Sequence, residues 1–93
     1  MYTAAEARTD VLLSKMDADR KVKVMTLVKE YEEKIKSAAE NGLRELKISK
    51  DEFESKFGND KGLIFDVLYV ISYRGFECFE PSPASIDYEI YWY

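Results

Sequence analysis

The stretch Ser85–Tyr93, with the sequence SIDYEIYWY, decides the fold because it alternates like a strand whose two faces differ. One face carries large side chains at every second position: Ile86, Tyr88, Ile90 and Trp92. The other face is acidic and then aromatic: Asp87, Glu89, Tyr91 and Tyr93. We expect the first face to pack against helices. The second face is either covered by helices as well or meets a partner.

A further strand is expected immediately upstream, over Phe76–Glu80. A loop of residues 81–85 separates the two strands, and its prolines cannot extend a ladder, so the simplest arrangement is a hairpin. In that hairpin Phe79 lies on the face away from the core, together with Tyr91 and Tyr93. Three aromatic side chains on a solvent face form the kind of patch that marks an interface.

The hairpin carries negative charges only, although the net charge of the whole chain is only −4. From Phe76 onward every charged side chain is acidic: Glu77, Glu80, Asp87 and Glu89. Such a segment repels nucleic acid. The basic run of Arg20, Lys21 and Lys23 is short and bordered by aspartates, which favours a solvated helix face over a phosphate-binding site.

The N-terminal part of the chain predicts a long helix. Thr3 and Glu6 form a capping box, and neither glycine nor proline interrupts the pattern before Gly42. An unbroken helix of this length would extend close to 60 Å, whereas a domain of this size has a radius of gyration of about 12 Å. Either the helix breaks near residues 18–21, or residues 1–20 project and pack against another molecule.

The middle of the chain predicts one strand and two helices. Residues 43–48 alternate, with Leu46 and Ile48 opposite Glu45 and Lys47, as in a half-buried strand. A second capping box at residues 49–52 starts a short helix that ends at residue 58. Residues 61–74 are rich in β-branched and aromatic side chains and would suit a strand or a helix; their length, their caps and their apolar stripe favour a helix.

The expected fold class is therefore α+β, in the order α-β-α-α-β-β, with a small, largely antiparallel three-stranded sheet and helices on one face. We expect residues 1–93 to form a single domain. A chain this short buries roughly two-thirds of its unfolded surface, so its stability margin is small and a partner would help it.

Catalytic and metal chemistry is largely excluded by composition. The chain has no histidine and a single cysteine, Cys78, so histidine-dependent triads and ordinary structural zinc sites are ruled out. The glycines form no phosphate-binding pattern. We expect no enzyme activity, no cofactor and no metal. The carboxylates near Cys78 are expected to raise the pKa of its thiol and to leave it unreactive.

The same composition bears on location. A lone cysteine cannot form an internal disulfide, which favours a reducing compartment such as a bacterial cytoplasm. No apolar run approaches the roughly 20 residues of a membrane span, and residues 1–8 lack the order of a secretion signal. We therefore expect no membrane association.

The layout of the chain resembles a class of small proteins encoded by tailed bacteriophages. The motifs that carry this resemblance are the MYTAAEAR opening at residues 1–8, KIKSAAENG at residues 34–42, YRGFECF at residues 73–79, and the closing Y-x-I-x-W of residues 88–92. The resemblance implies a viral accessory or virion-associated protein. It assigns no functional residue.

The leading hypothesis is a non-enzymatic bacteriophage protein that acts through protein–protein contacts, as a homo-oligomer or as a small subunit of a virion or other assembly, in the host bacterial cytoplasm or in the virion. One alternative is an inhibitor of a host enzyme or defence system, anti-CRISPR-like or a host-takeover protein, that places the acidic aromatic hairpin in a basic cleft. Another is weak nucleic-acid binding. The candidate partner-binding residues are Leu12, Leu13, Met16, Phe79, Tyr91, Tyr93, Glu77, Glu80, Asp87 and Glu89.

Overall fold

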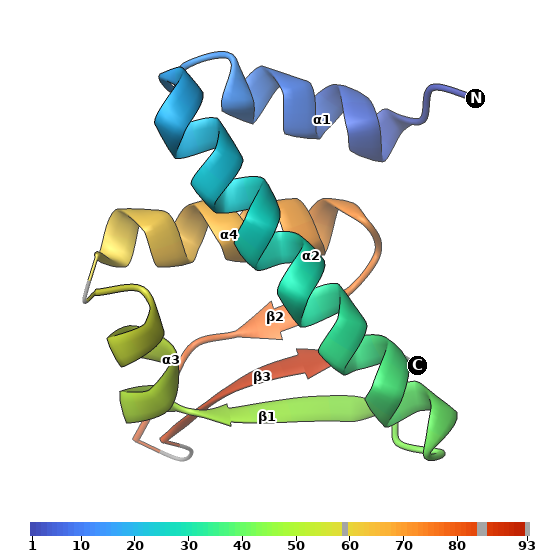
Figure 1. Cartoon of the computed structure of the whole chain (residues 1–93). Helices are drawn as coiled ribbons and strands as arrows, with labels where there is room; N and C mark the ends of the chain where they lie inside the picture. The colour runs from blue at the N-terminus through green and yellow to red at the C-terminus, as the bar shows by residue number, and fades with distance from the viewer. Residues whose placement is uncertain (59, 84–85, 93) are drawn as a thin grey trace.

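The computed structural model describes residues 1–58, 60–83 and 86–92 (Figure 1). Among these residues there are four helices and three strands, which confirms the α+β class. In chain order they are α1 (Ala4–Leu13), α2 (Ala18–Glu40), β1 (Glu45–Ser49), α3 (Lys50–Lys56), α4 (Lys61–Tyr73), β2 (Glu77–Phe79) and β3 (Asp87–Tyr91).

The expected N-terminal helix is broken, a few residues earlier than residues 18–21. α1 ends at Leu13 and α2 begins after Asp17, whose carboxylate accepts a hydrogen bond from the Arg20 N–H at 2.8 Å. This aspartate is a preferred N-cap, so it fixes the point at which the second helix starts. α1 then packs against α4 instead of projecting (Figure 1). The molecule measures 34 × 32 × 20 Å.

The three strands form one antiparallel sheet in the order β1-β3-β2. β2 and β3 pair as the expected hairpin, with Cys78 opposite Ile90. β1 pairs with the other edge of β3, with Ile48 opposite Tyr88. The stretch that the sequence singled out is therefore the central strand, and every strand contact in this sheet involves it.

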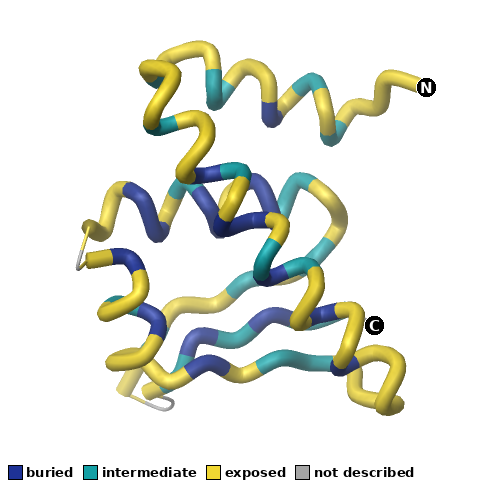
Figure 2. The backbone as a smooth tube through the Cα atoms, in the orientation of Figure 1, coloured by how far each residue is buried: buried dark blue, intermediate teal, exposed yellow. Residues whose placement is uncertain are grey.

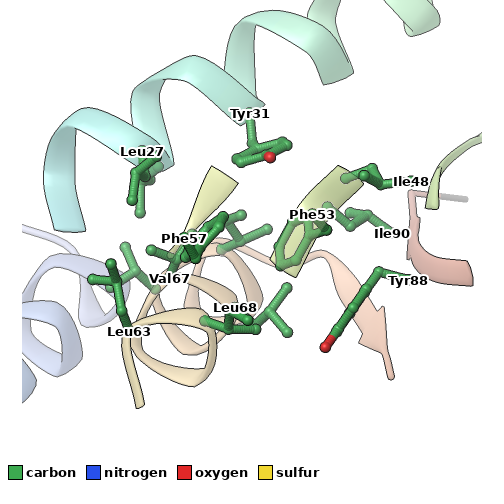
Figure 3. Packing of buried hydrophobic residues seen from close by; sticks show 14 of the residues in the cluster. Leu27, Tyr31, Ile48, Phe53, Phe57, Leu63, Val67, Leu68, Tyr88 and Ile90 are labelled. Atoms are coloured by element: carbon green, nitrogen blue, oxygen red, sulfur yellow. The ribbon is translucent and has the colours of Figure 1, made fainter. Parts of the chain in front are cut away.

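Helices cover one face of this sheet, and the core lies between the two layers (Figures 1 and 2). Its centre is a group of aromatic rings from three elements (Figure 3). The Phe53 ring of α3 stacks on the rings of Phe57 and Tyr88, with centroid distances of 4.6 and 4.5 Å. The ring centroid of Tyr31, on α2, lies 5.1 Å from that of Phe53. These rings join α2 and α3 to the central strand.

Residues 61–73, for which the sequence left helix and strand open, form the helix α4. Asp60 caps it by accepting a hydrogen bond from the Leu63 N–H at 3.0 Å, and Gly75 follows it with a φ of 98°, a conformation that glycine adopts without strain. The stripe that favoured a helix is buried, with Val70 beside it: Leu63, Ile64, Val67, Leu68 and Ile71. Burial of this stripe outweighs the strand propensity of its β-branched residues.

The start of α4 is tied to the start of α2 by Arg20. Its guanidinium donates to the Asp60 carboxylate at 2.8 Å and to the Asp66 carboxylate at 3.1 Å. Two further ion pairs connect α2 with later elements, Glu30 with Lys56 and Glu32 with Arg74. Charged groups of α2 therefore contact side chains of both α3 and the end of α4.

The Asp60 contacts predict how stability depends on pH. The hydrogen bond from the Leu63 N–H and the bond from Arg20 lower the pKa of Asp60 below its ordinary value of about 3.9. Its carboxylate therefore stabilises the fold fully above that value, and this contribution is lost as the pH falls through the lower, folded pKa. In urea unfolding followed between pH 6 and pH 2, Asp60→Asn should lose less stability on acidification than the original protein. An unchanged slope in Asp60→Asn would contradict this contribution.

Candidate functional site: the open face of the sheet

The two faces of the sheet differ in burial and in chemistry. In β3 the buried residues, Tyr88 and Ile90, alternate with half-buried ones (Figure 2). The strand register places the side chains of the face opposite the helices in three rows: Glu45, Lys47 and Ser49; Asp87, Glu89 and Tyr91; Glu77 and Phe79. We call these residues the open face, because the core and the helices lie on the other side of the sheet.

Two aromatic rings form a corner on the open face. The rings of Phe79 and Tyr91 lie 5.5 Å apart, nearly perpendicular at 75°. Phe79 is 46% exposed, and Tyr91 is half-buried. Edge-to-face packing holds the two rings in a fixed arrangement while leaving their faces accessible in part. We call this pair the aromatic corner.

Carboxylates surround the aromatic corner. Glu45 and Glu77 lie directly across from Tyr91 on the two neighbouring strands, and the Tyr91 hydroxyl donates to the Glu89 carboxylate at 2.9 Å. The hydrogen bond to Glu89, with burial and the Glu45 carboxylate adding to it, raises the pKa of Tyr91 to about 12. The Tyr91 phenol is therefore a neutral donor at physiological pH, held in place by acidic neighbours.

The open face has an excess of negative charge. It carries the carboxylates of Glu45, Glu77, Asp87 and Glu89 but only one ammonium group, that of Lys47, opposite Glu89 in the register. Aromatic rings next to carboxylates attract cations, because the ring faces and the carboxylates are both electronegative. A guanidinium or ammonium group of a partner fits this chemistry.

The structure brings together five of the residues that the sequence suggested for partner binding: Phe79, Tyr91, Glu77, Asp87 and Glu89. Glu80 does not belong with them. It lies beyond the end of β2, with Tyr88 beside the hollow between α3 and α4. Tyr93 lies outside the described residues. Ile86, which was expected in the core, precedes β3 and is 76% exposed.

The other candidate partner-binding residues lie at the opposite end of the molecule. Leu12, Leu13 and Met16 are half-buried and pack against the chain's own core near the junction of α1 and α2. The helix break turns α1 back, so the chain itself covers part of this apolar surface. These residues are separate from the open face.

Sequence reasoning missed the contribution of β1 to the open face. Glu45 and Lys47 were expected opposite Leu46 and Ile48, and their alternation was the available signal. The pattern did not say which strand β1 pairs with. Only the pairing with β3 places Glu45 beside Tyr91.

The Cys78 thiol is turned toward the core. Its Sγ lies 3.7 Å from the Leu68 carbonyl oxygen, and burial raises the pKa of the thiol to about 11. The sequence attributed a raised pKa to neighbouring carboxylates; the cause is instead the apolar surroundings.

This burial predicts slow alkylation of Cys78. At pH 8 the folded protein should react with iodoacetamide on the order of 100-fold more slowly than the urea-unfolded chain, because thiolate is the reactive form. Mass spectrometry of timed samples measures both rates. Equal rates in the folded and unfolded protein would contradict the burial of this thiol.

Other kinds of site find little support in the part of the chain that the structure describes. No three cysteine or acidic side chains gather there to hold a metal ion. None of the helices described is both long and apolar enough to cross a membrane. In the short basic run, the Arg20 guanidinium is already bound by Asp60 and Asp66, which leaves the exposed Lys21 and Lys23 as its accessible charges.

Comparison of the chain with models of protein families, with curated proteins and with solved structures gave no match.

Proposed function

We propose that the protein acts without catalysis, as a protein-binding module whose open face binds a basic surface of a different protein. One observation carries this proposal: the aromatic corner of Phe79 and Tyr91 lies among four carboxylates, on the sheet face that no helix of the described residues covers. A surface with these groups offers both apolar contact area and charge.

The geometry suits an arginine or lysine side chain. A cation above an aromatic ring gains about 0.5–2 kcal/mol, depending on how far it is desolvated. Carboxylates at the rim, such as Glu45 and Glu89, can accept charge-assisted hydrogen bonds from the same group. Their long-range field also speeds the encounter with a basic partner.

The charge of the open face disfavours self-association through it. Two copies meeting face to face would place the carboxylates of both molecules in one interface, and like charges in an interface reduce affinity. We therefore favour a partner of different sequence over a homo-oligomer built through this face.

The resemblance to small bacteriophage-encoded proteins suggests where such a partner would be found. It would be a basic subunit of a virion or another phage assembly, or a host protein whose basic cleft the acidic face blocks. Mass spectrometry of purified particles, beside affinity isolation from infected cells, distinguishes the two cases. Recovery in particles supports the first, and recovery on one host protein supports the second.

Replacement of the aromatic corner tests the binding face itself. The partner recovered on the immobilised original protein should be lost, or bound at least tenfold more weakly, with Phe79→Thr and Tyr91→Thr combined. Tyr2→Thr is the matched control, because it removes an exposed aromatic ring from the N-terminal end, away from the sheet. Equal binding by both variants in calorimetry would show that the partner binds elsewhere.

A further inference from the structure

The pairing of the three strands determines which backbone N–H and C=O groups point to the outer edge of β2. The Trp92 N–H donates to the Arg44 carbonyl oxygen at 3.0 Å, so the hydrogen-bonded pairs between β1 and β3 are those in phase with it, Leu46 with Ile90 among them. The backbone groups of Ile90 therefore point to β1, and those of Glu89 and Tyr91 point to β2.

This phase fixes the direction of the Cys78 backbone. The backbone groups of Glu89 and Tyr91 bond to Phe79 and Glu77, the β2 residues opposite them. Cys78 lies between Glu77 and Phe79, so its N–H and C=O are directed away from β3. In the described sheet no strand lies beyond β2. The Cys78 N–H and C=O thus face the edge at which another strand would pair.

A groove runs along the same edge. Between the outer side of α4 and β2 lies a hollow of about 150 Å³, lined by Phe65, Leu68, Tyr69, Ser72, Cys78 and Glu80. Phe65 and Tyr69 are 37% and 51% exposed at its rim. An edge strand beside a helix with an apolar hollow between them is the arrangement that recognition by strand addition uses.

We propose that this edge accepts an extended, basic segment of the partner as a fourth strand of the sheet. The proposal rests on the function proposed above and specifies how the partner is held. Alternate side chains of the added strand would enter the groove beside Cys78, while the others would lie on the open face next to Phe79 and Glu77. The groove and the aromatic corner are thus two sides of one binding site.

The negative charge along β2 favours a basic segment at this edge. Among the described residues from Phe76 to the end of β3, every charged side chain is acidic, with Glu77 and Glu80 flanking Cys78. If two copies paired through β2, they would bring these acidic segments together, and like charges across a strand pair destabilise it. A segment with lysine or arginine at alternate positions meets opposite charge instead.

A random peptide library tests the proposal without knowledge of the natural partner. Peptides about eight residues long, near the length of an ordinary strand, are selected on the full-length protein and then titrated into the ¹⁵N-labelled protein. We expect selected peptides to be extended and rich in lysine or arginine at alternate positions. On saturation the hydrogen exchange of the Cys78 amide should slow at least tenfold.

Phe65→Ser with Tyr69→Ser should weaken binding at least tenfold, whereas Val22→Ser, an exposed control on α2, should not.

The possible results distinguish strand addition at β2 from binding on the open face alone. Peptides that need Phe79 and Tyr91 but leave the Cys78 amide unprotected would overturn strand addition and leave the open face as the binding surface. Selection of acidic peptides, or of none, would overturn the proposed occupant. Protection of Cys78 that depends only on protein concentration, together with dimers in light scattering, would assign the edge to a second copy of the chain and contradict the proposal.

Discussion

Phe53→Ala is expected to destabilise the protein by about 3–5 kcal/mol, the usual range for removing a buried phenylalanine. Its ring is fully buried and stacks on Phe57 and Tyr88. The truncation would leave a cavity where α2, α3 and the central strand meet (Figure 3). Domains of this kind are stable by only about 5–15 kcal/mol, so the variant should lose a large share of its stability.

Urea unfolding followed by circular dichroism measures this loss. Ile86→Ala is the control, because Ile86 is 76% exposed despite lying in the stretch that the sequence assigned to the core. It should change the free energy of unfolding by less than about 0.5 kcal/mol. A similar loss in both variants would contradict the description of the core.

Reversal of the charges on the open face is expected to abolish partner binding. Changing Glu77, Asp87 and Glu89 to lysine places cations around the aromatic corner, so a basic partner is repelled where it was attracted. We expect the affinity for the isolated partner to fall at least 100-fold, or ~2.7 kcal/mol. The corresponding glutamine and asparagine variants should lie between this variant and the original protein. Calorimetry at two salt concentrations measures the loss of affinity and shows how far salt screens it.

A matched control separates local charge from net charge. Asp19→Lys, Glu33→Lys and Glu40→Lys change the net charge by the same amount on exposed positions of α2. This variant should keep nearly the original affinity. If it loses binding to the same degree, attraction by the open face is not the cause.

The sequence predicted the features that depend on neighbouring residues. The two predicted N-caps are confirmed, with hydrogen bonds from the Glu6 N–H to the Thr3 hydroxyl and from the Glu52 N–H to the Ser49 hydroxyl. The alternation of the last strand correctly separated Tyr88 and Ile90 from Glu89 and Tyr91. Caps and periodicity act over a few residues, so their physics is visible in a short window of sequence.

Features that depend on distant residues were less predictable. The strand order β1-β3-β2 places Glu45 on the open face, but no local pattern shows which strand β1 joins. Glu80 was grouped with the other acids of the hairpin, because the sequence showed their charge but not that the strand ends before Glu80, which lies beside Tyr88. The break before α2 is set by the Asp17 N-cap, which lies just before residues 18–21, where a break was expected.

Hydroxyl-radical footprinting of the protein with and without its partner tests the binding face most directly, since it reports the solvent contact of individual side chains. If the open face binds the partner, oxidation of Phe79 and Tyr91 falls several-fold in the complex, while oxidation of Leu12, Leu13 and Met16 is unchanged. Protection of those three residues with unchanged oxidation of Phe79 and Tyr91 would place the partner on the helical end and contradict the account.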